Sequence, residues 1–305
     1  MSLRLPYDGS DPQFRDFYLK GVTPEAWQQH WYLRTREILD KYQTDVLYFD
    51  GGLPFGDYGL QLAAESYDRS IARHGGRNEA VLNLKRAPVE GAYVHDIERG
   101  QSDKLRLLPC QTDTTLISGW FYHKADLEMT APVVVANLAD IVSKNGNLLL
   151  NVGLQPDGTL PNNQRETLAS VGRWLALNGE TIHETRPWRT FGEGPTRVVQ
   201  GAFNEPKSGF TAADIRFTTR GYVLYAIVLG WPGTGVTVTI TNLAAGQEPT
   251  AIASVHLLGQ DTALKYSRDA AGLKVKFPNR PPCKHALLLK TVSQSTRLSD
   301  LNSDR

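Results

Sequence analysis

The acidic side chain with the clearest surroundings for chemistry is Asp50, which follows a short apolar run and precedes two glycines. The run Val46–Phe49 is rich in β-branched and aromatic residues and predicts a strand buried on both faces of a parallel sheet. A carboxylate at the carboxyl end of such a strand, next to Gly51-Gly52, is a typical catalytic position in α/β folds, because the glycines leave room for a ligand. The alternative is that Asp50 only caps the following loop.

A second stretch with room for chemistry is the polar segment 86–113, which shows no clear hydrophobic periodicity. A segment of this length without an element of its own is uncommon inside a compact domain, and it is more often a functional loop than part of the scaffold. We therefore expect residues 86–113 to form a functional loop.

The elements that must position these residues alternate between helices and strands. The expected helices span 24–42, 60–74, 130–144 and 161–178, and the expected strands span 46–50, 79–85, 114–120, 147–152 and, weakly, 180–184. This alternation predicts a parallel sheet with helices packed outside it. About five strands are too few for a closed eight-stranded barrel, so the sheet is either open or part of a barrel.

The pattern changes near Thr196. From there to about residue 292 no helical stripe occurs, and short alternating runs such as Tyr222–Leu229 and Val236–Ile240 are separated by turn residues. Several short strands at such spacing predict an antiparallel β-sandwich. We expect a partial barrel domain at 1–195, a β-sandwich at 196–292 and a polar tail at 293–305.

Composition narrows the class of protein. The 305 residues carry a formal net charge of +1, which favours neither a nucleic acid nor an anionic membrane as a partner. No apolar run approaches the roughly 20 residues of a membrane helix, and the N-terminus lacks the apolar core of a secretory signal, so we expect a soluble protein and assign no compartment. We expect Cys110 and Cys283 to be free thiols, and the scattered histidines indicate no metal site.

Four segments of the chain, taken in order, resemble one family of enzymes. They are DVLYFDGG, NLLLNVGLQPDGTLP, VGRWLALNGETIHETRPW and FTAADIRFTTRGYVLYAIVLGWP, and the resemblance covers most of residues 11–290. The family is the α-L-fucosidases of glycoside hydrolase family 29. The resemblance implies a (β/α)8-like catalytic barrel followed by a C-terminal β-sandwich. It also implies hydrolysis of fucosylated glycans or small α-L-fucosides with retention of configuration, without a metal or organic cofactor.

The resemblance implies that Asp50 is the catalytic nucleophile. A retaining glycosidase needs two carboxyl groups roughly 5 Å apart around the scissile bond. One attacks the anomeric carbon and must be ionised, and the other donates a proton to the leaving oxygen. Asp50 fits the first role, so the second carboxyl group must come from another strand end or from a long loop.

The acid/base residue lies in the most variable part of the family. Many members carry a Trp-Glu-Thr motif shortly before a Trp-x-Tyr motif, but this chain has Cys110-Gln111-Thr112 there, and Gln111 cannot donate a catalytic proton. Other members use an acid just before an arginine further upstream, which favours Glu98 in the sequence Glu98-Arg99-Gly100. A surface ion pair is the alternative for Glu98. Asp96 is the next candidate, and the same segment also contains Asp103 and Asp113.

Four further residues are expected to bind the sugar. Trp120 and Tyr122 have rings that can stack on its apolar face, although core packing explains both residues at least as well. Asn151, near the end of an expected strand, can hydrogen-bond a ligand or a loop. His95 can contact sugar hydroxyls, although a lone loop histidine is usually solvated.

The resemblance begins after the third strand of the family's barrel, so the βα units whose histidines and tryptophan grip the fucose are expected to be absent. We therefore expect an incomplete (β/α)5 TIM-like barrel followed by the antiparallel β-sandwich. Open sheet edges promote aggregation unless they are covered, which favours a homo-oligomer in which copies of the chain cover one another. A fragment of a longer enzyme is a second interpretation. A third is a non-catalytic carbohydrate-binding or structural remnant of a fucosidase.

Overall fold

The computed structural model describes residues 11–14, 23–86, 91–124, 126–205, 209–247, 249 and 251–293, and it divides into two units, Met1–His95 and Asp96–Arg305. The predicted polar tail, apart from Ser293, lies outside the described residues. The elements of the first unit are a 3₁₀ helix (Pro12–Phe14), α2 (Pro24–Tyr42), β1 (Val46–Gly52), α3 (Asp57–Arg73), β2 (Val81–Arg86) and the start of β3 (Val94–Glu98).

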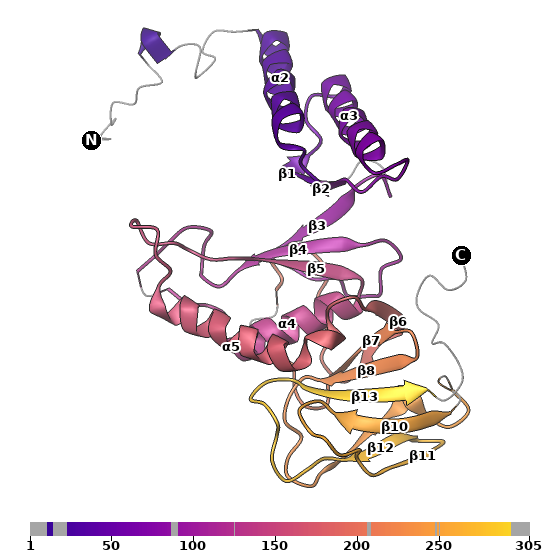
Figure 1. The fold of residues 1–305 in the computed structure, drawn as a ribbon. Helices are drawn as coiled ribbons and strands as arrows, with labels where there is room; N and C mark the ends of the chain where they lie inside the picture. The colour runs from indigo at the N-terminus through magenta and orange to yellow at the C-terminus, as the bar shows by residue number, and fades with distance from the viewer. Residues whose placement is uncertain are drawn as a thin grey trace. The chain divides into compact units, whose positions relative to one another are not determined.

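The second unit holds the rest of β3 and the remaining elements (Figure 1). They are β4 (Cys110–Thr115), α4 (Ala131–Ser143), β5 (Gly146–Asn151), α5 (Asn162–Asn178), a 3₁₀ helix (Gly179–Thr181), β6 (Arg186–Glu193), β7 (Ile215–Arg220), β8 (Val223–Val228), β9 (Thr237–Ile240), a 3₁₀ helix (Thr241–Leu243), β10 (Ile252–Leu257), β11 (Tyr266–Asp269), β12 (Gly272–Lys276) and β13 (Leu287–Ser293).

The parallel strands are hydrogen-bonded in chain order, β1-β2-β3-β4-β5. Two antiparallel sheets follow, with the orders β10-β13-β8-β7-β6 and β11-β12-β9. This combination confirms the predicted fold class, a five-stranded part of a barrel followed by a β-sandwich.

In the first unit, α2 and α3 lie side by side and cover one face of β1 and β2 (Figure 1). The helix α2 begins at Pro24 because the preceding Thr23 caps it: the Thr23 hydroxyl accepts a hydrogen bond from the Ala26 amide at 3.2 Å. Its buried residues pack on β1, β2 and α3, and the core consists of Tyr32, Leu39, Leu47, Leu62, Ala63 and Leu82.

The prediction that Val46–Phe49 is buried on both faces is wrong. Leu47 and Phe49 pack against the helices, whereas Val46 is 55 % exposed and Tyr48 is 37 % exposed. The reason is that the two helices cover a single face of β1, and the alternation of the strand turns every second side chain to the other face. The apolar run therefore marks a strand with one uncovered face.

In the second unit, α4 and α5 lie between the parallel strands and the larger antiparallel sheet (Figure 1). One core joins all three layers, since side chains of α4 and α5 pack with Ile227 of β8 and Leu288 of β13. The Trp174 indole donates to the Ala286 carbonyl at 2.8 Å, which adds a buried hydrogen bond between α5 and the segment before β13. The helices therefore bury apolar surface on both of their sides.

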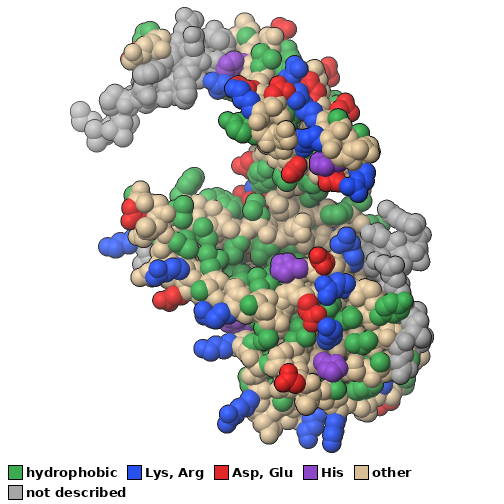
Figure 2. Space-filling model, in the orientation of Figure 1, with side chains coloured by type: hydrophobic (Ala, Val, Ile, Leu, Met, Phe, Trp, Pro, Cys, Tyr) green, Lys and Arg blue, Asp and Glu red, His purple; other side chains and the backbone are tan. Residues whose placement is uncertain are grey.

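The β-sandwich has its own core, which includes Trp188 and Phe217. Their rings pack edge to face, with 5.1 Å between the ring centroids. Trp188 belongs to β6, which pairs antiparallel with β7. The domain boundary expected at residue 195 stays a prediction, and we propose that the sandwich begins with β6. Over this sandwich, Lys and Arg side chains are interspersed with Asp and Glu on the face shown in Figure 2.

Three predicted elements differ from the structure. The segment 86–113 contains a strand, β3, which escaped prediction because its five residues include only two apolar ones, Val94 and Ile97, without regular alternation. The strand expected at 114–120 lies earlier, at Cys110–Thr115, and consists mostly of threonine and other polar residues. The weak strand expected at 180–184 is instead part of a 3₁₀ helix and turns.

Candidate active site

Asp50 lies on the face of β1 that α2 and α3 leave uncovered. Its side chain is 79 % exposed, and its Oδ1 atom lies 3.1 Å from Nζ of Lys85 on the neighbouring strand β2. Lys85 is mostly buried. The ammonium supplies a positive charge beside the carboxylate, and a carboxylate nucleophile must be ionised to react.

A β-bulge sets the direction of the backbone at Asp50. The register of β1 and β2 runs regularly to Phe49 opposite Leu84 and then shifts, so that Gly52 lies opposite Arg86. Gly51, inside the bulge, has φ = 139°, a conformation that residues with a side chain rarely adopt. A Cβ atom built on Gly51 meets nothing within 4 Å, so the space predicted beside Asp50 is present.

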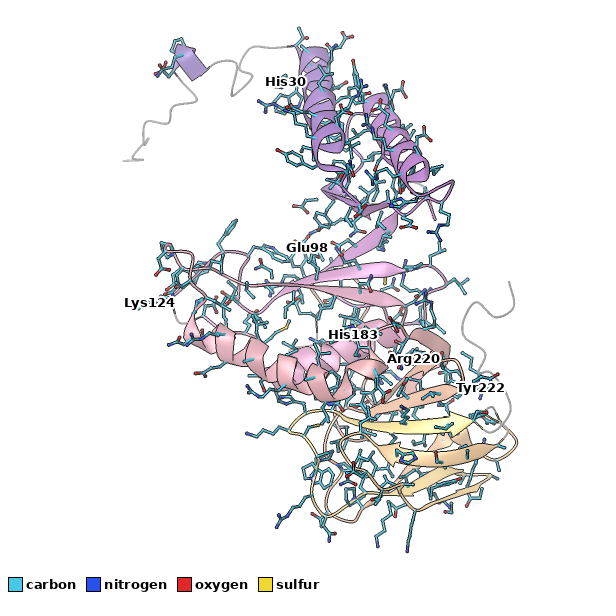
Figure 3. The ribbon with its side chains drawn as sticks, viewed as in Figure 1. His30, Glu98, Lys124, His183, Arg220 and Tyr222 are labelled. Atoms are coloured by element: carbon cyan, nitrogen blue, oxygen red, sulfur yellow. The ribbon has the colours of Figure 1, made fainter. Side chains whose placement is uncertain are left out.

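The second candidate carboxylate, Glu98, is the last residue of β3 and is labelled in Figure 3. Alternation along the strand places Asp96 and Glu98 on the same face. Asp96 is buried and accepts a hydrogen bond from Gln111 Nε2 at 3.0 Å, whereas Glu98 is half-buried. A bound molecule can therefore reach Glu98 without displacing Asp96 or its neighbours. This geometry favours Glu98 over Asp96 as the proton donor.

Arg99, the residue after Glu98, joins three segments of the second unit. Its Nε donates to Glu205 Oε1 at 2.7 Å, its Nη2 to Glu128 Oε2 at 2.9 Å and its Nη1 to the Ser118 carbonyl at 2.7 Å. Burial works against the charged guanidinium, but Glu205 and Glu128 outweigh this effect and raise the pKa of Arg99 above its ordinary value. A permanently charged side chain thus holds the end of β3.

Asn151 and Trp120 come together where β4 and β5 end. The Asn151 Nδ2 donates to Thr115 Oγ1 at 3.1 Å and to the Trp120 carbonyl at 3.2 Å, so the amide holds the loop that follows β4. Tyr122 belongs to the same loop, and its backbone lies against Gly153, where an added Cβ would come within 3.0 Å of Tyr122 Cα. Both rings are half-buried, and sugar binding by Trp120, Tyr122 and Asn151 stays a prediction.

The remaining candidates are less favourably placed. His95 of β3 pairs with Leu84 of β2. It lies three positions before Glu98, and because side chains alternate along a strand, the two point to opposite faces of β3. Asp113 is buried within β4, and Asp103 is exposed in the loop before it. The role of His95 in sugar binding stays a prediction.

Two contacts at the site were not predicted from the sequence. Lys85 ends an expected strand next to the strand of Asp50, and the meeting of parallel strand ends at one edge was a signal that could have identified it. The partners of Arg99 gave no such signal, because Glu205 lies 106 positions further along the chain. Contacts at that separation follow from the tertiary fold alone.

The part of the chain that the structure describes has no group of three or more His, Cys, Asp or Glu side chains placed to hold a metal ion. No helix within the described residues is long and apolar enough to cross a membrane. Cys110 and Cys283 are free thiols, as predicted, and burial raises the pKa of both.

Comparison with known sequences identifies relatives along most of the chain. Residues 1–180 match the family description "Alpha-L-fucosidase", and residues 208–291 match "Alpha-L-fucosidase C-terminal domain". The tissue α-L-fucosidase of Bos taurus is 34 % identical over 259 residues, which cover 81 % of this chain and 50 % of the bovine protein. The plasma α-L-fucosidase of Pongo abelii is 30 % identical over 304 residues, which cover 92 % of this chain and 57 % of that protein. The chain therefore spans about half the length of these relatives.

Solved structures share the fold. An α-fucosidase of Thermotoga maritima in complex with a mechanism-based inhibitor superposes with a TM-score of 0.69 at 24 % identity, covering 92 % of this chain and 60 % of that one. Another structure, described as an alpha-L-fucosidase, gives a TM-score of 0.70 at 22 % identity. The match covers 92 % of this chain and 59 % of that one. At these identities the likeness concerns the fold.

Proposed function

Because this chain belongs to the α-L-fucosidase family, we propose that it hydrolyses terminal α-L-fucosides with retention of configuration. The observation that carries the proposal is the placement of two carboxylates. Asp50 and Glu98 each lie near the carboxyl end of a parallel strand, in a sequence that matches the family over residues 1–180. Active sites of barrel enzymes lie at these strand ends.

In the proposed mechanism Asp50 attacks the anomeric carbon of the fucose and forms a glycosyl ester. The bond from that carbon to the leaving oxygen breaks, and Glu98 gives its proton to this oxygen. Glu98 then removes a proton from water, which attacks the same carbon and releases Asp50. Two inversions give net retention. Lys85, whose Nζ lies 3.1 Å from Asp50 Oδ1, would place a positive charge beside this carboxylate at both the start and the end of the cycle.

The decisive experiment follows release of the chromophore from a nitrophenyl α-L-fucoside by the parent chain, Asp50→Gly and Asp68→Asn. Asp68 is an exposed aspartate on α3 and serves as the control. We expect Asp50→Gly to lower kcat at least about a thousandfold, azide to restore part of it as the fucosyl azide, and Asp68→Asn to match the parent.

The outcomes separate the proposed enzyme from a remnant. A folded parent chain without turnover, which binds L-fucose equally well after Asp50→Asn, would contradict catalysis and support a carbohydrate-binding remnant. Turnover that survives Asp50→Gly would keep the enzyme but remove Asp50 as the nucleophile.

We propose that the enzyme is an oligomer, and exposed apolar residues at the two ends of the parallel strand order support this. β1 and β5 occupy these ends, and Val46 on β1 and Leu149 on β5 are exposed apolar residues on faces that no helix covers. Exposed apolar edge strands associate unless another surface covers them. Light scattering after gel filtration should give a mass of at least two chains, and a stable monomer at micromolar concentration would contradict the proposal.

A further inference from the structure

Two strained backbone positions meet at the end of β3. Arg99 has φ = 44° and Phe203 has φ = 59°, both in the left-handed region that residues with side chains rarely adopt. The amide of Phe203 donates to the Glu98 carbonyl at 2.8 Å, which fixes Phe203 directly beside the candidate acid. Such conformations persist only where neighbouring contacts hold them, and they are concentrated at functional sites.

The contact between the two segments leaves no room for adjustment. Gly100 lies so close to Gly201 that a Cβ on Gly100 would come 1.9 Å from the Gly201 carbonyl oxygen. The Glu205 amide also donates to the Arg99 carbonyl at 2.9 Å. The segment 199–205, between β6 and β7, is therefore attached to the end of β3 along its length.

This attached segment presents an aromatic ring to solvent. Phe203 is 64 % exposed, and its neighbour Val199 is exposed as well. In Figure 2 apolar side chains are visible at the surface of the second unit near its parallel strands. Strained positions are concentrated at ligand sites, so an exposed ring on such a backbone, next to the candidate acid Glu98, favours contact with a ligand.

A second exposed ring belongs to a segment that another nitrogen of the same guanidinium binds. Arg99 Nη1 donates to the Ser118 carbonyl, and three residues later Phe121 is 79 % exposed. Arg99 Nε binds Glu205, two residues after Phe203. The half-buried Arg99 thus holds Ser118, three residues before Phe121, and Glu205, two residues after Phe203, at the end of β3 next to Glu98.

The chemistry of the acid decides what these rings contact. A general acid delivers its proton to the leaving oxygen, so the leaving group lies on the acid's side of the scissile bond. We propose that Phe203, with Phe121 as the second ring, forms the subsite for the leaving group, and that this group is a pyranose whose apolar face stacks on the rings. The inference rests on the proposed function, because it requires Glu98 to be the acid/base.

The test compares two substrates that share the fucosyl group and differ in the leaving group. α-L-Fucosyl fluoride releases fluoride, which has no ring to stack, whereas a fucosyl-galactose disaccharide releases a pyranose. We expect Phe203→Ala to lower kcat/KM about tenfold for the disaccharide, mainly through KM, and less than twofold for the fluoride. Phe203→Trp keeps a ring and should restore most of the disaccharide activity.

Tyr222→Ala is the matched control, since Tyr222 is an exposed aromatic residue in the turn between β7 and β8 (Figure 3). It should change neither substrate. The same comparison made by calorimetry, with the disaccharide and free L-fucose on an Asp50→Asn background, gives a readout independent of turnover. There Phe203→Ala should weaken only the disaccharide.

The outcomes separate the two proposals. Equal losses for both substrates in Phe203→Ala, or a disaccharide that binds no more tightly than L-fucose, would overturn the leaving-group subsite and leave the fucosidase intact. A chain that neither hydrolyses nor binds any α-L-fucoside would overturn the proposed function, and the subsite with it.

Discussion

Two lysine–carboxylate pairs in this protein consist of the same chemical groups and differ in their surroundings. Lys85 and Asp50 lie 3.1 Å apart, and the Asp50 side chain is 79 % exposed. Lys144 and Asp140 lie 2.6 Å apart, and the Asp140 side chain is fully buried. The first pair lies near the ends of two parallel strands. In the second, Asp140 lies on α4 and Lys144 directly follows this helix, next to Arg216 of the antiparallel sheet.

The buried pair is part of a larger charge cluster. Arg216 of β7 donates from Nε to the other Asp140 oxygen at 2.6 Å, and Lys144 also donates to the Ser102 carbonyl at 2.8 Å. Both cations lie over the Phe191 ring, at 4.7 and 5.5 Å from its centroid. Burial lowers the pKa of Lys144 even though the Asp140 carboxylate opposes this effect. Asp140 therefore joins α4 to the sandwich and is needed by the fold.

The comparison shows how burial assigns different roles to one type of pair. An exposed ion pair contributes about 0–1 kcal/mol because water already solvates both charges. Asp50 can consequently change its partner at little cost to stability. Asp140 has no such freedom, because removing it leaves two cations in the interior without their carboxylate.

The largest effect is expected from Asp140→Asn. Loss of one partner of a buried ion pair typically reduces the free energy of unfolding by about 3–5 kcal/mol. Here both Lys144 and Arg216 lose their carboxylate partner. Urea unfolding at pH 7 should show this loss in the free energy of unfolding. Asp50→Asn is the matched change at the exposed pair and should shift the same quantity by less than about 1 kcal/mol. Similar losses in both variants would contradict the conclusion that burial makes Asp140 more important for stability than Asp50.

A third carboxylate, Asp214, is buried without a cation among the described residues as its partner, and its stabilising effect depends on pH. Asp214 is fully buried, and although burial favours its neutral form, the Thr196 and Thr211 amides and hydroxyls donate to it at 2.8–3.0 Å and lower its pKa below 3.8. Its stabilising contribution is therefore complete above the unfolded pKa and is lost as the pH falls through the folded pKa.

Asp214→Asn should accordingly reduce the free energy of unfolding by about 1–3 kcal/mol at pH 7. The difference from the parent should stay constant above the unfolded pKa of about 3.9 and shrink as the pH falls below it towards the lower folded pKa, which denaturant unfolding at several pH values can measure. A difference that stays constant down to pH 3 would contradict the assigned cause.

The smallest structural effect is expected from Lys85→Met, which keeps most of the side-chain volume and removes the charge beside Asp50. The free energy of unfolding should change by less than about 1 kcal/mol because the ion pair is exposed on the Asp50 side. The kcat/KM for a nitrophenyl α-L-fucoside should fall, because the positive charge beside Asp50 is lost. An unchanged kcat/KM would mean that Lys85 plays no part in the chemistry.

The sequence allowed the class of fold to be predicted because its signals are local. A helix start at Thr23-Pro24, and alternating runs such as Tyr222–Leu229, depend on neighbouring residues only. The position of β4 was missed because its residues Cys110–Thr115 are mostly polar, yet most of them are buried in the structure. Packing between distant segments overrides local polarity in such a strand, and no periodicity reveals it.

The candidate site was predictable to the same extent. Asp50 has a local signature, the apolar run and the two glycines, and Glu98 was selected only by its resemblance to other sequences. The contact of Phe203 with Glu98 joins residues more than a hundred positions apart, and it depends on how the segment before β7 returns to β3. Such a contact cannot be predicted from the residues on either side of Phe203 or Glu98.

The attachment of segment 199–205 to the end of β3 should restrict recombination that exchanges the C-terminal half of this chain for that of a relative. The segment precedes β7 and would travel with the sandwich in any exchange of C-terminal halves between relatives, while Arg99 would stay behind. A chimera would contain Glu205 without the matching arginine, or Gly201 opposite a residue that no longer fits, and the misfit would lie at the end of β3 beside Glu98. The two halves of this chain are therefore expected to be inherited together.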